Sequence, residues 1–112
     1  MDEKEILDIK FNYEKRFNEL FFSKDFKEKM VKEFSYCPQG LTFEPHFDKE
    51  DKEWSFCACC KKYNYDFYSY EIGDYTILKK EIKEEWAKFM IKYVRENDEK
   101  LADEIKNKVY YV

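Results

Sequence analysis

Glycine and proline occur only in the middle of this chain. The four positions are Pro38, Gly40, Pro45 and Gly73. Because both residues interrupt regular helices, residues 1–36 and 74–112 are free to be largely helical, and 37–73 is predicted to be β structure. The chain has 112 residues, which is enough for one hydrophobic core, and we expect a single domain over 1–112.

Alternating apolar and polar residues predict a β-hairpin. The expected inward set is Leu41, Phe43, Pro45 and Phe47 in the first strand, and Trp54, Phe56 and Ala58 in the second. The charged segment 48–53 is the expected turn. Because opposed residues of an antiparallel pair share a face, Phe47 should lie opposite Trp54, and Leu41 opposite Cys60. Pro45 lacks an N–H donor and makes the first strand an edge strand.

Helices are expected on both sides of this hairpin. For residues 6–13 the pattern fits a strand or a helix, whereas 14–20 is clearly helical and Ser23 can cap a second helix. After Gly73, helical spacing is found at Leu78, Ile82, Trp86, Phe89 and Tyr93, and Leu101, Ile105 and Val109 continue an apolar face.

A third strand is expected over 63–72, where a change in the alternation suggests a β-bulge near Phe67. The predicted fold is therefore α+β: a three-stranded antiparallel meander over about 41–72, flanked by N- and C-terminal helices.

The charge balance favours some partners over others. The formal charge is −4, from 25 acidic against 21 basic residues. This balance opposes non-specific binding to nucleic acid, which depends on an excess of lysine and arginine. We find no signal peptide and no long apolar run, and expect no membrane contact and a cytoplasmic location, where cysteines are usually thiols or metal ligands.

No enzyme motif is present. Two glycines cannot build a glycine-rich phosphate loop, and the only histidine, His46, cannot supply a site that needs several histidines. We therefore expect a protein that is not an enzyme, and we look for its function in its cysteines and its surface.

Four cysteines carry the clearest chemical pattern. They are Cys37, Cys57, Cys59 and Cys60. The two-residue spacing of Cys57 and Cys60 is that of a zinc knuckle, and the hairpin register brings Cys37 to the same end as Cys59 and Cys60. We expect these four thiolates to hold a structural Zn²⁺, with the chain turning after Ala58. Buried thiols, or a disulfide or redox role, are the alternatives.

His46 is the alternate zinc ligand. In the predicted register it lies opposite Ser55, about 15 Å from Cys60 at ~3.4 Å per residue, which is too far for a shared tetrahedral ion. An exposed or hydrogen-bonded strand residue is the other interpretation of His46.

Aromatic and acidic clusters point to binding surfaces. Lys61 and Lys62 precede a tyrosine-rich strand, which could stack bases and suggests a small zinc-ribbon-like nucleic-acid-binding protein as the alternative function. Acidic groups at 48–53, 81–85 and 96–99 suggest instead a solvated face or a docking surface for a basic nucleic-acid channel.

The chain as a whole resembles the small phage-encoded anti-CRISPR proteins that inhibit Cas9. The resemblance is one of overall character: a short, acidic chain that is rich in Lys, Glu, Tyr and Phe and has no enzyme motifs. The four cysteines sharpen it, because an inhibitor stabilised by a bound metal would fit this class. It implies a non-enzymatic inhibitor of the host-cell cytosol that binds a Cas9-type effector and blocks DNA loading or cleavage. No site residues carry over, because no motif aligns.

Overall fold

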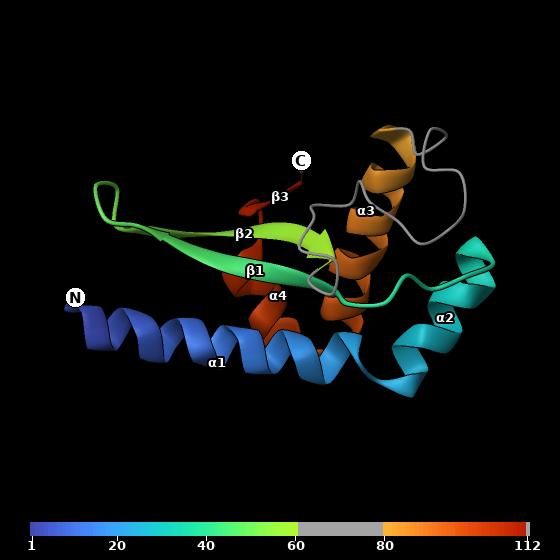
Figure 1. The fold of residues 1–112 in the computed structure, drawn as a ribbon, viewed down its shortest axis with the longest axis horizontal. Helices are drawn as coiled ribbons and strands as arrows, with labels where there is room; N and C mark the ends of the chain where they lie inside the picture. The colour runs from blue at the N-terminus through green and yellow to red at the C-terminus, as the bar shows by residue number, and fades with distance from the viewer. Residues whose placement is uncertain (61–79, 112) are drawn as a thin grey trace.

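The computed structural model describes residues 1–60 and 80–111 (Figure 1). The helices are α1 Glu3–Phe21, α2 Lys24–Phe34, α3 Lys80–Asn97 and α4 Glu99–Ile105. The strands are β1 Leu41–Asp48, β2 Glu53–Cys60 and β3 Val109–Tyr111. The α+β class and the helices on both sides of the hairpin are confirmed. The strand expected over 63–72 lies outside the described residues.

Helix α1 settles the question of residues 6–13, which are helical. The Asp2 side chain caps the helix by accepting a hydrogen bond from the Glu5 amide at 2.9 Å. Glu3 and Glu5 in the first turn add favourable charge at the positive end of the helix dipole. Phe17 and Phe21 are buried further along the same helix. Capping and burial therefore both favour one continuous helix over a strand.

The β1–β2 hairpin has the predicted register. Leu41 lies opposite Cys60, and Phe47 lies opposite Trp54. The turn is held by the Asp48 carboxylate, which accepts hydrogen bonds from the amides of residues 50 and 51 at 2.9 and 3.1 Å. Pro45 lies in β1, which is an edge of the described sheet, as its missing N–H requires.

The third described strand differs from the prediction. β3 pairs in parallel with β2, so the described sheet is mixed and is not an antiparallel meander. Val109, expected on a helical face, lies opposite Phe56. Helix α4 ends at Ile105, and Asn107 has a φ of 61°, which turns the chain before β3. The sequence of β3, Val-Tyr-Tyr, is typical of strands and adds to the open edge of β2.

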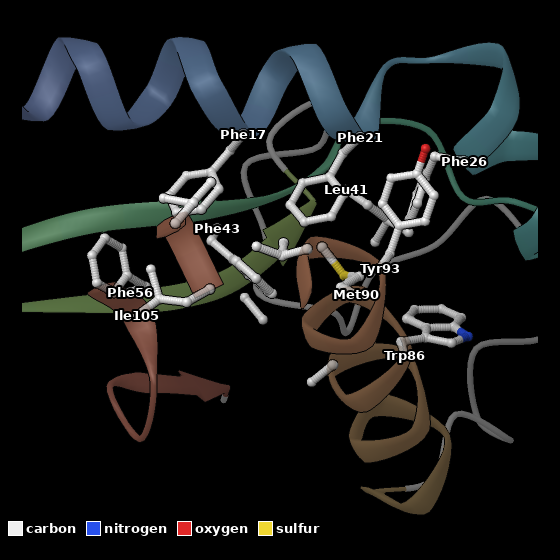
Figure 2. Close-up of a cluster of buried hydrophobic side chains, with 14 of the residues drawn as sticks. Phe17, Phe21, Phe26, Leu41, Phe43, Phe56, Trp86, Met90, Tyr93 and Ile105 are labelled. Carbon is white, nitrogen blue, oxygen red and sulfur yellow. The ribbon is translucent and has the colours of Figure 1, made fainter. Parts of the chain in front are cut away.

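An aromatic cluster joins α1 to the hairpin. The Phe17 ring packs edge-on against Phe43, with ring centroids 5.5 Å apart, and against Phe56 at 5.6 Å. Figure 2 shows Phe17 and Phe21 pointing from α1 toward the strands, with Met90 and Trp86 of α3 on the far side of the cluster. Each of these six side chains is at most 2% exposed. Helices α1 and α3 thereby cover one face of the hairpin.

Helices α2 and α3 are linked by a small polar network. Ser23 caps α2 by accepting from the Phe26 amide at 3.1 Å, and its hydroxyl lies 3.2 Å from the Tyr93 hydroxyl. Tyr93 of α3 donates to the Asp25 carboxylate at 2.9 Å. The hydrogen bond from Tyr93 is the main cause that lowers the pKa of the Asp25 carboxyl. Desolvation raises this pKa in part, and Lys29 lowers it further.

This network predicts a pH-dependent contribution to stability. A carboxylate whose pKa is lowered in the folded state stabilises the fold above its ordinary pKa of 3.8, and the contribution is lost as the pH falls through the folded value. We expect Tyr93→Phe to lower the melting temperature at neutral pH, and the difference from the wild type to shrink in acid. Thermal denaturation followed by circular dichroism across this pH range measures both effects.

The matched control is Tyr13→Phe, because the Tyr13 hydroxyl makes no hydrogen bond within the described residues. Tyr13→Phe should leave the pH profile unchanged. A difference between Tyr93→Phe and wild type that stays constant down to strongly acidic pH would contradict this role of Asp25.

Candidate functional site

An acidic surface forms where the start of α1 meets the β1–β2 turn. Figure 1 shows the N-terminus and the hairpin turn at the same end of the molecule. Eight exposed carboxylates and three lysines lie in residues 1–8 and 48–53, a formal charge of −5, whereas the whole chain carries −4. We call this surface the acidic end. Its carboxylates are Asp2, Glu3, Glu5, Asp8, Asp48, Glu50, Asp51 and Glu53.

An ion pair and a shared hollow show that the two halves of the acidic end lie side by side. The Lys49 ammonium lies 3.6 Å from the Glu3 carboxylate. An open hollow of about 470 Å³ lies between the two segments, with Ile6 and Phe47 among its lining residues. Because both groups of the ion pair are well exposed, that pair contributes little stability. The packing of α1 on the hairpin, rather than the ion pair, therefore positions the acidic end.

Sequence reasoning found only half of this surface. Sequence spacing groups the carboxylates of 48–53, but it does not join those of 1–8 to them, because the nearest ends of the two segments, Asp8 and Asp48, are 40 positions apart. The only available indication was the acidic first turn that marks a helix N-terminus. That pattern locates the helix end, but it does not say which part of the fold lies beside it.

Cys57 and Cys59 lie in strand β2, whereas Cys37 precedes β1. Phe56 and Ala58 belong to the core beneath α1, so Cys57 and Cys59 lie on the opposite face by strand alternation. Cys57 is 4% exposed and is paired with Glu44 in the ladder, and Cys59 is 3% exposed and is paired with Thr42. Cys37, Cys57 and Cys59 are present as thiols.

Part of the geometry predicted for zinc is wrong. β2 continues as a strand through Cys60, so the turn expected after Ala58 does not form there. Within 1–60 and 80–111, no group of three or more His, Cys, Asp or Glu side chains could hold a metal. The four-cysteine set requires Cys60, whose side chain lies outside the described part, so the Zn²⁺ site stays a prediction.

Cys37 borders a separate hollow at the far end of α1. The hollow measures about 640 Å³, and Phe21, Phe22 and Lys27 also line it. Burial raises the pKa of the Cys37 thiol, and the Lys27 ammonium lowers it in part. A thiol with a raised pKa is protonated at neutral pH and is a weak nucleophile. These properties suit a packed thiol better than a catalytic cysteine.

His46 lies opposite Ser55 and is exposed, as the register predicted. The lysines and tyrosines of the expected stacking strand, from Lys61 to Tyr70, lie outside the described residues.

Comparison of the chain with protein-family models, with curated proteins and with solved structures finds no match. In the described part of the chain, no helix is both long and apolar enough to cross a membrane.

Metal analysis tests the predicted zinc site. Four thiolates would leave no open coordination position, so the ion would stabilise the fold and would not activate water. We expect one Zn²⁺ per chain in protein purified without a histidine tag. Since metal binding would contribute to folding free energy, Cys57→Ser should lower both the zinc content and the melting temperature. His46→Ala is the control and should change neither.

Two results would contradict this prediction. Protein that contains no zinc and melts identically with and without a chelator would have ordinary buried thiols. Zinc that is lost in the His46→Ala variant would mean that the ligand set is wrong.

Proposed function

We propose that this protein is a non-enzymatic inhibitor that binds a basic, nucleic-acid-handling effector protein through its acidic end. The observation that carries the proposal is the concentration of carboxylates there. The formal charge of −5 on 14 residues exceeds that of the whole chain, so the remainder is close to balanced. The acidic end therefore gives the molecule a strong charge asymmetry.

Such a surface suits a partner whose binding channel is positively charged. Complementary potentials increase the rate of encounter and select the partner, and exposed carboxylates can occupy positions that phosphates otherwise take. The molecule is elongated, with extents of 43 × 28 × 22 Å, and the acidic end lies at one tip of its long axis. A narrow acidic tip can enter a channel that a broad surface cannot.

The specific partner proposed is a Cas9-type effector. Its nucleic acids lie in positively charged channels, and an acidic ligand there would block DNA loading or cleavage. The resemblance in character to phage-encoded anti-CRISPR proteins supports this choice, and a phage protein of this kind would act in the host cytosol. An acidic inhibitor of another nucleic-acid-handling protein is the wider form of the same proposal.

A binding assay with charge-reversed variants tests the proposal. Glu50→Lys combined with Asp51→Lys reverses two exposed charges and leaves the Asp48 carboxylate, which holds the turn. We expect wild-type protein to bind guide-loaded Cas9 and inhibit DNA cleavage. The double variant should bind about tenfold more weakly, which corresponds to about 1.4 kcal/mol. Binding of the wild type should also weaken as salt is added.

The matched control reverses the same number of charges far from the acidic end. Glu28→Lys combined with Glu33→Lys does so on α2, at the opposite end of the molecule (Figure 1). This control should bind as the wild type does. No complex and unaltered cleavage at excess protein would overturn the Cas9 form of the proposal. Equal weakening by both double variants would show that net charge, and not the acidic end, governs binding.

A further inference from the structure

Two large apolar side chains of α1, Leu7 and Phe11, face solvent, and we call this pair the exposed stripe. Leu7 is 64% exposed and Phe11 is 70% exposed, and they lie one helical turn apart. They point away from the core, which α1 contacts through Phe17 and Phe21. Large apolar side chains that gather on one exposed helix face indicate an interaction surface.

Charged side chains flank this stripe in a regular order. Along the helix they are Lys4, Asp8, Lys15 and Glu19, and all four are exposed. Successive positions four and seven residues apart return to nearly the same side of a helix, so these charges form one row. None of the four makes an ion pair with another described residue. The row is therefore available to a partner.

The order of charges in this row is complementary to itself. Read from the N-terminus it is positive, negative, positive, negative, and read from the other end it is the reverse. An antiparallel second copy of α1 would therefore place Lys4 opposite Glu19 of that copy, and Asp8 opposite its Lys15. A parallel copy in register would place like charges together, which is unfavourable.

The same arrangement centres the interface on Phe11. The four charged positions are symmetric about the point midway between residues 11 and 12. A two-fold axis at this point brings the Phe11 side chains of both copies together. An open hollow of about 410 Å³ lies beside Phe11 on this face of the helix, and Glu14, Lys15, Asn18 and Glu19 also line it. A central aromatic anchor with charges at the rim is the usual arrangement of a binding hot spot.

We propose that two copies of this chain associate through α1, antiparallel, with Phe11 at the two-fold axis. We choose a second copy of the chain as the partner because the row of charges on α1 is complementary to the same row on an antiparallel copy. α1 has 19 residues and is about 28 Å long at 1.5 Å per residue, so the interface is small. A small interface gives a weak, reversible dimer. The interface shares Lys4 and Asp8 with the acidic end, but the argument for the dimer does not use the function proposed for that end.

Sedimentation velocity across a wide concentration range tests the dimer. We expect wild-type protein to change from monomer to dimer as the concentration rises, and Phe11→Glu to weaken association by about tenfold or more. Because Phe11 is exposed, the variant should keep its fold, which circular dichroism checks. Ile91→Glu is the matched control: it replaces an exposed apolar residue of α3 and should dimerise normally.

A charge swap tests the antiparallel register. Asp8→Lys and Lys15→Asp should each weaken self-association, because each places like charges opposite one another. A mixture of the two variants should restore it, since both pairs then become complementary.

Three results would overturn the proposal: wild-type protein that is monomeric at every concentration, a dimer that Phe11→Glu does not weaken, or a mixture that associates no better than the single variants. A monomer that captures another protein through Phe11 would assign the stripe to a different partner.

Discussion

The packing of Phe17 against the hairpin is the interaction on which the rest of the structure depends. Its ring contacts Phe43 of β1 and Phe56 of β2, and it lies at the centre of a core that also receives side chains from α3. A buried aromatic side chain removes a large apolar area from water, and edge-to-face ring contacts add to that contribution. By fixing α1 along the hairpin, this contact also determines which side chains remain exposed. The carboxylates of 1–8 come to lie beside those of 48–53, and Leu7 and Phe11 face solvent.

The same packing divides the hairpin into two chemically different faces. Phe43, Phe56 and Ala58 face α1 and belong to the core. Strand alternation then puts Cys57 and Cys59 on the other face, where both are buried. Cys37 lies outside the hairpin, four residues before β1 begins. A zinc site on this face would have to bring Cys37 toward Cys57 and Cys59.

The sequence predicted the parts of this structure that depend on local periodicity. The hairpin register followed from period-two alternation, since a slip of one residue would turn Phe43 and Phe56 outward. Residues 6–13 were ambiguous because their apolar positions fit both periods, and the Asp2 cap with the burial of Phe17 decides for helix. β3 was missed because Val109 continues a helical spacing, while its pairing with Phe56 depends on a contact between distant segments. The α1 half of the acidic end was missed for the same reason.

Native-state hydrogen exchange tests most directly whether α1 is held on the hairpin by this packing. Amides of α1 around Phe17 and amides of β1 around Phe43 should exchange with similar free energies, because they unfold as one cooperative unit. NMR measurement of exchange at each amide resolves the two segments. Similar, high protection in both is the result that we predict. Fast exchange throughout α1, with β1 and β2 still protected, would mean that the helix is not fixed on the sheet, and the acidic end would not exist as a single surface.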